Sequence, residues 1–291
     1  MGSIKEFWEE NPVGENLVKR DKNWSIHFKN YDSFRYDTER HILMELDKID
    51  FSRKRVLEIG VGQAADSLQM AKRGAVWYGL DLTDAAKQRA EKRFELESQP
   101  YGEVKVGNAN EIPWPDNYFD IVYSHGVLHH IPDLDEAQCE ISRVLKPNGK
   151  LIIMLYHKSS FCYWLSIAII RRLGLLALMI FEKIKILKLD SQSVLAKHIS
   201  NARKKGVFSY LKMSNFIHSN TDGPDNPYSK VYTVDDMQKA FTCFKLNEYR
   251  CHFINERHFP FLKYVPRQLK QSLASRFGWH LWGFLVNGKS K

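Results

Sequence analysis

Short apolar runs rich in Val, Ile, Leu and Tyr recur from position 55 onward and predict β-strands. The runs are RVLEIG, VWYGLD, EVKVGN, FDIVYSH and KLIIMLYH. Helix-forming or loop stretches separate them. This alternation predicts an α/β fold in which a parallel sheet has helices on both faces. Ligands bind such sheets at the carboxyl ends of the strands.

The regions on either side of this pattern differ from it. Residues 1–50 lack strand patterning and predict helices with scattered aromatic residues. Beyond position 190, DGPDNPYSKVYT predicts an irregular loop, and Thr233 with Asp236 predicts a capping box that opens a helix over 234–241. FKLNEYRCHF and HLWGFLVNG predict two late strands.

The segment FCYWLSIAIIRRLGLLALMIFEKIKILKL, Phe161 to Leu189, is apolar enough to raise the question of a membrane span. Arg171 and Arg172 divide it, and each would cost roughly 2.5–3.5 kcal/mol at a helix centre. We therefore expect no spanning helix. An amphipathic lid over the active site is favoured, and a peripheral membrane contact through 161–189 is the alternative.

The net charge of +9 is unevenly distributed along the chain. Residues 1–150 carry 21 Lys and Arg against 26 Asp and Glu, whereas residues 151–291 carry 22 against 8. The basic half suits an anionic partner, or it is a solvated surface that aids solubility. The four cysteines form no Cys-x-x-Cys pair, which predicts reduced thiols and a cytoplasmic location.

A glycine-rich motif ends the first predicted strand. Glu58, Gly60 and Gly62 lie in a Gly-x-Gly-x-x-Ala spacing, and Asp81 ends the second strand, where it can bind ribose hydroxyls. An NAD dehydrogenase fits these features equally well. A Glu58 carboxylate would repel a pyrophosphate and favour a cationic ligand such as S-adenosylmethionine. Alternatively, Glu58 only holds the loop.

An ordered set of motifs resembles the class I S-adenosylmethionine-dependent methyltransferases, in the type 11 branch with quinone-biosynthesis and natural-product enzymes. It consists of RVLEIGVGQAADSLQMAKRGAVWYGLDLT, VGNANEIPWPDNYFDIVYSHGVLHHIPD and ISRVLKPNGKLIIMLYH, over roughly residues 50–157. The resemblance implies a Rossmann-like, seven-stranded, mostly parallel sheet. We expect a helical cap over 1–50, a cofactor-binding core over 51–158, a helical lid insertion over 159–232, and a helix and strands over 233–291 that complete the sheet.

The resemblance also implies roles for individual residues around the cofactor S-adenosylmethionine. Glu58, Gly60 and Gly62 would line the methionine moiety. Asp81 would bind the ribose, and Leu82 would pack on the adenine.

Further along the chain, Asn108 and Ala109 would meet the adenine edge. The family usually has Asp where Asn108 stands, but an amide oxygen can still accept from the adenine amine. Ser124 and His125 would lie near the sulfonium. Trp114 would cover the adenine or, alternatively, pack in the core.

An N-terminal helix often closes the cofactor site in this class. Arg35 could then pair with the cofactor carboxylate, and Tyr31 or Tyr36 could hydrogen-bond it. The alternative is a surface arginine with aromatic packing.

Two adjacent histidines, His129 and His130, follow the fourth strand in SHGVLHHIPD. One of them could act as a general base, with His129 the preferred candidate, or both could only fix the loop. Methyl transfer needs a base only if the acceptor holds its proton at neutral pH. No metal is expected, because two adjacent histidines on one helix cannot easily bind the same ion.

The interpretation is an S-adenosylmethionine-dependent methyltransferase acting on a small organic acceptor, such as a natural product or lipophilic metabolite. A membrane-peripheral enzyme for a lipid or quinone-like acceptor and a non-catalytic cofactor-binding scaffold are alternatives. No nucleic-acid partner is expected, because neither a base-flipping motif nor an RNA-binding domain is recognisable. The oligomeric state is left open.

Overall fold

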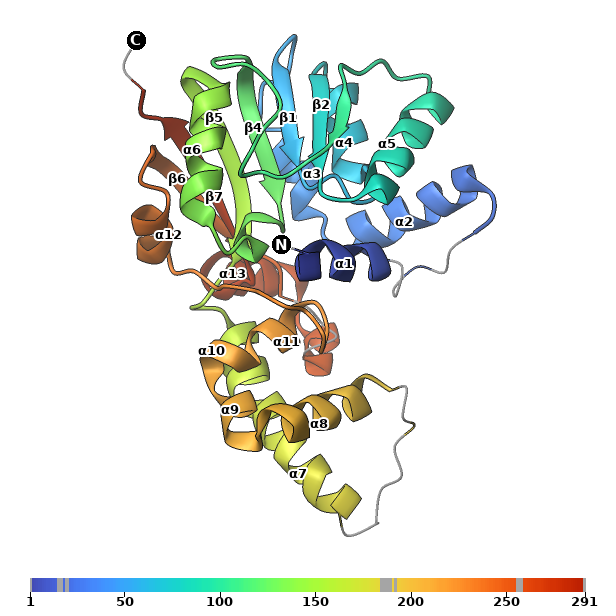
Figure 1. Cartoon of the computed structure of the whole chain (residues 1–291), viewed down its shortest axis with the longest axis vertical. Coiled ribbons are helices and arrows are strands. Elements are labelled where there is room, and N and C mark those ends of the chain that lie inside the picture. The colour runs from blue at the N-terminus through green and yellow to red at the C-terminus, as the bar shows by residue number, and fades with distance from the viewer. Residues whose placement is uncertain are drawn as a thin grey trace.

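A seven-stranded sheet forms the centre of the protein (Figure 1). The computed structural model describes residues 2–14, 18, 21–183, 190, 193–254 and 259–289. The strands are β1 Arg55–Ile59, β2 Val76–Asp81, β3 Val104–Val106, β4 Phe119–His125, β5 Leu145–Tyr156, β6 Phe244–His252 and β7 His280–Asn287. Their order is β3-β2-β1-β4-β5-β7-β6. Strands β1 to β5 pair in parallel, and β7 is antiparallel to β5 and β6. The predicted Rossmann-like sheet is confirmed.

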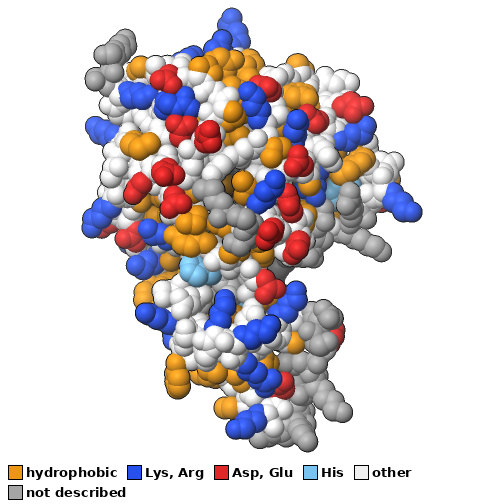
Figure 2. Space-filling model, in the orientation of Figure 1, with side chains coloured by type: hydrophobic (Ala, Val, Ile, Leu, Met, Phe, Trp, Pro, Cys, Tyr) orange, Lys and Arg blue, Asp and Glu red, His pale blue; other side chains and the backbone are white. Residues whose placement is uncertain are grey.

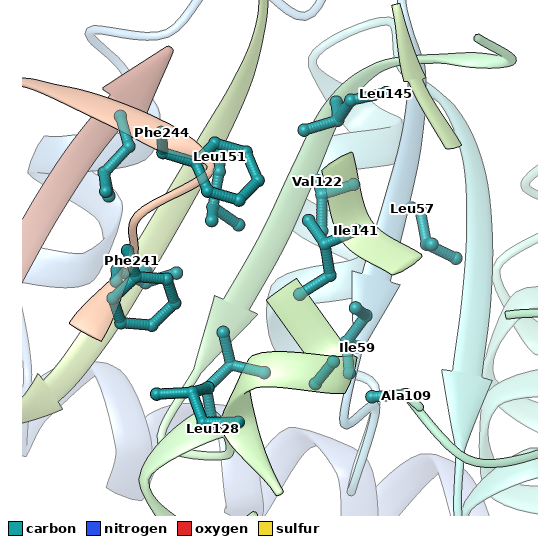
Figure 3. Close-up of a cluster of buried hydrophobic side chains, with 14 of the residues drawn as sticks. Leu57, Ile59, Ala109, Val122, Leu128, Ile141, Leu145, Leu151, Phe241 and Phe244 are labelled. Carbon is teal, nitrogen blue, oxygen red and sulfur yellow. The ribbon is translucent and has the colours of Figure 1, made fainter. Parts of the chain in front are cut away.

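The sheet buries apolar side chains on both faces, because successive strand residues point to opposite sides. Val56 and Ile152 belong to one buried cluster, and their neighbours Leu57 and Ile153 belong to another. The first cluster packs against α3 His41–Leu46, α4 Ala65–Lys72 and α5 Asp84–Leu96. The second, shown in Figure 3, packs against α6 Leu134–Val144 and α12 Val234–Ala240. Helices therefore cover both faces, as expected.

The described residues of the N-terminal segment form the helices α1 Gly2–Glu10, α2 Trp24–Thr38 and α3. Helix α2 begins at Asn23, whose side chain accepts hydrogen bonds from the backbone N–H groups of Ser25 and Ile26. In α3, Ile42 and Leu46 are fully buried within the sheet cluster. The segment 1–50 thus supplies a core helix in addition to its helices at the ligand end of the sheet.

A helical lobe, residues 159–232, follows β5 and projects beyond the carboxyl ends of the strands (Figure 1). It contains the π-helix η2 Cys162–Arg171, then α7 Arg172–Lys183, α8 Val194–Lys205, α9 Val207–Leu211, α10 Met213–Phe216 and α11 His218–Thr221. A separate apolar cluster from these helices fills its interior. Residues 184–189 of the predicted apolar segment lie outside the described residues.

The chain returns to the sheet after the lobe. Thr233 accepts a hydrogen bond from the backbone N–H of Asp236 at 3.0 Å, and the Asp236 carboxylate accepts from the Thr233 N–H at 3.1 Å. This confirms the predicted capping box. The remaining elements are the 3₁₀ helices η1 Leu128–His130 and η3 Pro260–Tyr264, and the helix α13 Arg267–Phe277.

The position of β7 between two other strands makes its side chains central to stability. We expect Leu281→Ala to lower the free energy of unfolding by about 2–5 kcal/mol, because Leu281 is fully buried and its truncation leaves a cavity. Leu269→Ala, at an exposed position of α13, is the matched control and should change it by less than about 0.5 kcal/mol. Urea unfolding of the two variants measures both values. Equal destabilisation would contradict the central role of β7.

Candidate active site

A cavity of about 520 Å³ opens at the carboxyl ends of β1, β2 and β4. This volume lies within the roughly 300–1,000 Å³ that is usual for ligand pockets. The N-terminal segment contributes Trp8 and Val13 to its wall, and the lobe contributes Thr221 and Asp222. The predicted site residues that line it are Glu58, Gly60, Gly62, Asp81, Leu82, Asn108, Ala109, His125, His130, Tyr31 and Arg35. Of the described lining residues, none is Ser124 or His129.

The apolar helix after β5 does not contribute to this wall. None of the described lining residues comes from 161–183, and the helix extends away from the sheet (Figure 1). The expectation that this segment forms a lid over the site is therefore not met by its described part. The lobe reaches the cavity through the end of α11 instead.

Two glycines with positive φ shape the loop after β1. Gly60 has φ +82° and Gly62 has φ +55°. A Cβ added at Gly60 would lie 2.1 Å from the Val127 side chain, whereas one at Gly62 would meet only Val13, at 3.8 Å. The loop can therefore hold its backbone directly against a ligand, and Gly60 cannot be replaced without displacing Val127.

The Asp81 carboxylate anchors this glycine loop. One oxygen accepts from the backbone N–H groups of Val61 and Gly62 at 2.8 and 3.1 Å. The other accepts from the backbone N–H and hydroxyl of Thr83 at 2.9 and 2.8 Å. Asp81 is thus a structural link between β2 and the loop, as well as a candidate ribose ligand.

Glu58, near the end of β1, helps to hold the glycine loop through hydrogen bonds to α4 and β2. Its carboxyl group is buried and accepts hydrogen bonds from the Ser67 hydroxyl and from the indole N–H of Trp77, the latter at 2.9 Å. Burial, reinforced by the nearby charge of Asp66, raises the pKa of Glu58 to about 8. The group is then mostly uncharged at neutral pH. The sequence argument that a Glu58 carboxylate repels a pyrophosphate loses its basis, and the loop-holding role is the one that its hydrogen bonds support.

Asp66, which the sequence reasoning missed, is the centre of a buried polar network. Arg35 donates two hydrogen bonds to its carboxylate, at 2.9 and 2.6 Å. The hydroxyls of Tyr36 and Tyr123 donate to it at 3.1 Å each. Burial opposes ionisation, but the Arg35 guanidinium outweighs it and lowers the pKa of Asp66 to about 2. An acidic residue in the first turn of the helix after the glycine loop is the signal that could have identified it.

The role expected for Arg35 changes accordingly. Its guanidinium lines the cavity but already pairs with Asp66, and it lies 3.6 Å from a Glu39 oxygen. Arg35 therefore joins α2 to α4, and a ligand carboxylate would have to share it with two acidic groups.

The N-terminal segment closes the cavity over the glycine loop. Gln63 donates from its side-chain amide to the Val13 carbonyl at 3.0 Å. Gly14, at φ +80°, lies so close to the buried Tyr31 ring that an added Cβ would be 2.3 Å away. Tyr31 is therefore a packing residue under this loop that also lines the cavity.

The residues expected around the adenine fall on one side of the cavity. Leu82, Asn108 and Ala109 line it, and the Asn108 side-chain oxygen accepts from the backbone N–H of Asn110 at 3.2 Å. Trp114 packs edge-on against core aromatic rings and is not among the described lining residues. The core alternative for Trp114 is the one observed.

Of the two residues at the end of β4 that were expected near the sulfonium, His125 lines the cavity and Ser124 does not. Ser124 is buried and donates to the Ile59 carbonyl at 3.1 Å, so it joins β4 to β1. His125 lines the cavity, and its Nδ1 lies 3.4 Å from an Arg35 nitrogen.

Three histidines from distant parts of the chain meet beside the cavity. Nε2 of His41 lies 3.0 Å from Nδ1 of His280. One ring nitrogen from each of His41, His125 and His280 lies within 4.8 Å of the other two. Burial, with the charge of Arg35 second, lowers the pKa of His125 to about 3. Neutral imidazoles are metal ligands, but the neighbouring Arg35 guanidinium opposes a cation. We assign no metal, and its absence stays a prediction.

The adjacent histidines after β4 have different surroundings. His129 is fully buried, and its ring packs against Tyr156 with centroids 3.9 Å apart. His130 lines the cavity, and its Nε2 lies 3.2 Å from the Asp222 carboxylate. Its Nδ1 lies 2.7 Å from the Tyr228 carbonyl, to which it can donate. The geometry thus favours His130 over His129, the reverse of the preference drawn from sequence.

Comparison with known proteins identifies the type of domain. Residues 57–153 match a family model described as "Methyltransferase domain". This central part of the chain, about a third of its length, is a methyltransferase domain, and its motifs are those of the class I S-adenosylmethionine-dependent methyltransferases of the type 11 branch.

Individual relatives resemble this methyltransferase chain over its central part. It is 33% identical over 104 residues to phosphoethanolamine N-methyltransferase 2 of Caenorhabditis elegans, which is 35% of this chain and 24% of that protein. It is 31% identical over 101 residues to 27-O-demethylrifamycin SV methyltransferase of Amycolatopsis mediterranei, which is 34% and 37% of the two chains. The match thus covers less than two fifths of the length of either relative.

The fold extends the likeness beyond the aligned motifs. A solved S-adenosylmethionine-dependent methyltransferase from Mesorhizobium loti has a TM-score of 0.52 at 15% sequence identity. It covers 86% of this chain and 98% of that one. This likeness shows a shared fold.

The charges in the cavity fit the cofactor of this methyltransferase family. The described lining residues include five carboxyl groups, Glu39, Glu58, Asp66, Asp81 and Asp222, and two guanidinium groups, Arg35 and Arg89. A buried oxygen of Glu39 has no hydrogen-bond partner among the described residues, although an Arg35 nitrogen lies 3.6 Å from it. Glu58 is mostly uncharged and Asp66 is paired with Arg35, but Glu39, Asp81 and Asp222 still outnumber the other guanidinium group, Arg89. S-adenosylmethionine carries an ammonium, a sulfonium and no phosphate, so this remaining excess of acidic groups suits it better than a dinucleotide.

The buried histidines predict acid sensitivity. The pKa of His125 is about 3 in the folded protein and about 6.5 in an unfolded chain. The unfolded state therefore binds more protons between these values, so this stability is present above about pH 6.5 and is lost as the pH falls toward 3. We expect unfolding free energy to decrease from pH 7.5 to 5, and His125→Asn to reduce that slope by up to about 1.4 kcal/mol per pH unit. Urea unfolding at several pH values measures this, and identical slopes would contradict it.

Proposed function

We propose that the protein transfers a methyl group from S-adenosylmethionine to a small lipophilic organic acceptor. The observation that carries this proposal is the carboxyl-rich cavity behind the glycine loop of a class I methyltransferase domain. The sulfonium is a good leaving group, so the reaction needs mainly the alignment of acceptor, methyl carbon and sulfur. The cap and the lobe, which both line the cavity, would supply that alignment.

The cofactor would lie along β1, β2 and the loop after β3. Backbone groups at Gly60 and Gly62 would approach its methionine moiety, and Glu39 offers a buried oxygen for the ammonium. Asp81 would accept hydrogen bonds from the ribose hydroxyls with the same carboxylate that accepts from the backbone N–H groups of Val61 and Gly62. The adenine would lie beside Asn108.

The acceptor would lie toward the lobe. Tyr156 and Asp222 line this part of the cavity, and the Tyr156 hydroxyl donates to Asp222 at 2.9 Å. Trp8 adds an aromatic edge, 5.2 Å between centroids from His130. The mixture of rings and a single hydrogen-bonded carboxylate suits an acceptor with an apolar body and one polar reacting group.

His130 is the candidate base for an acceptor that carries a proton. With Nδ1–H donating to the Tyr228 carbonyl, the lone pair of the neutral ring lies on Nε2, next to Asp222. A proton released by the acceptor to Nε2 creates an imidazolium, which the Asp222 carboxylate stabilises. The acceptor's electron pair forms the new bond to carbon while the C–S pair leaves with sulfur. An acceptor that reacts unprotonated, such as a carboxylate, bypasses this step.

The names of the relatives leave the methylated atom open. One of those named above is an N-methyltransferase, and the other acts on a 27-O-demethylated rifamycin. The alternative of a silent cofactor-binding scaffold makes a distinct prediction: cofactor binding without turnover for any acceptor.

Cofactor binding tests the proposal directly. Calorimetry should show binding of S-adenosylhomocysteine and no binding of NAD. Asp81→Ala should weaken the former by about 10- to 150-fold, since a charged hydrogen-bond acceptor worth roughly 1.5–3 kcal/mol is lost. Asp84→Ala, an exposed carboxylate in the first turn of α5, should leave affinity unchanged. NAD binding without a response to S-adenosylhomocysteine would refute the proposal.

Turnover tests the base. With an acceptor that loses a proton, His130→Ala should lower kcat by about 10²–10⁴-fold, while the affinity for S-adenosylhomocysteine hardly changes. Asp222→Asn should lower kcat in the same direction, because the imidazolium loses its partner. His129→Asn should keep most activity, since His129 does not line the cavity. A fully active His130→Ala would show that proton removal proceeds without this residue.

A further inference from the structure

The long apolar helix of the lobe has a face that no described part of the protein covers. The helix runs over Cys162–Lys183 with a mean hydropathy of 1.9 in its most apolar window, of which 17% is buried. Leu173 is 62% exposed and Ile180 is 58% exposed. The bare face consists of Trp164, Leu165, Ile169, Ile170, Leu173, Leu176, Ile180 and Phe181, in which successive residues are one, three or four positions apart.

The opposite face of this helix packs inside the lobe. Tyr163, Ile167 and Leu175 are buried against α8, α9 and α10. Arg171 donates to the Asn220 carbonyl at 2.7 Å, which fixes the middle of the helix to α11. A helix with one packed face and one bare apolar face fits the plane of a membrane interface.

The rest of the lobe is basic. Residues 159–232 contain eleven Lys and Arg against four Asp and Glu. Exposed cations include Lys204 and Lys205 at the end of α8 and Lys212 after α9, and none of them has an ion pair within the described part of the chain. Figure 2 shows Lys and Arg side chains beside hydrophobic ones on this lobe. Phe208, just after the basic run, is 93% exposed.

We propose that the lobe binds the surface of an anionic lipid bilayer, with the bare face in the interfacial layer. Apolar side chains would enter the boundary of the acyl chains, and the flanking cations would meet anionic headgroups. A second copy of the chain fits less well, since two lobes of formal charge +7 would repel each other. The proposal stands independently of the methyl transfer proposed above.

Vesicle flotation of the full chain tests this surface. The protein should float with vesicles of phosphatidylcholine mixed with phosphatidylglycerol and bind those of phosphatidylcholine alone more weakly. High salt should reduce binding because it screens the headgroup attraction. Leu173→Asp with Ile180→Asp should lower the partition coefficient by about tenfold or more, since two apolar groups no longer enter the membrane. Met44→Asp with Leu96→Asp is the matched control, because both residues are exposed outside the lobe, and this variant should bind like wild type.

A charge-reversal pair separates electrostatics from insertion. Lys204→Glu with Lys205→Glu should abolish the preference for phosphatidylglycerol, whereas Lys87→Glu with Lys92→Glu in α5 should not. Circular dichroism and thermal unfolding verify that each variant is folded.

Three results would overturn the proposal. The first is a wild-type protein that does not float with anionic vesicles. The second is membrane binding that resists alkaline extraction, which would indicate a spanning helix. The third is an oligomer that Leu173→Asp with Ile180→Asp converts to monomer, which would assign the bare face to contacts between copies.

Discussion

The ion pair between Arg35 and Asp66 is the interaction on which the site depends most. It joins α2 to the first turn of α4, directly behind the glycine loop. Tyr36 and Tyr123 satisfy the remaining lone pairs of the carboxylate. A buried ion pair without such additional hydrogen bonds would not recover its desolvation cost. Here the network is complete, and it fixes the position of the cap relative to the strands.

The sheet and the cofactor side of the cavity were predictable because their signals are local. Strand alternation, the glycine spacing and the acidic residue ending β2 are each readable within a few residues. Asp81 could be placed at the site from its position alone. Its hydrogen bonds to Val61 and Gly62 could not, since they depend on how two loops approach each other.

What sequence reasoning missed involves residues brought together from distant positions. Asp222 lies 92 positions after His130, and no spacing rule relates them. His41, His125 and His280 come from α3, β4 and β7. Glu58 was assigned a charge that its burial removes. Likewise, the apolar segment was expected to cover the cavity, because its composition does not tell where in the fold the helix lies. The packing of Ile167 and Leu175 in the lobe shows which face of the helix turns outward.

The insertion of β7 between β5 and β6 has a consequence for folding during synthesis. β7 is the last strand in chain order, yet it forms the neighbour of both and supplies His280 to the histidine cluster. Until residues 280–287 emerge from the ribosome, one edge of β5 has unpaired N–H and C=O groups. Both apolar clusters also lack their β7 side chains. The nascent chain would therefore expose an unpaired strand edge, which is prone to aggregation, while the residues between β5 and β7 are synthesised.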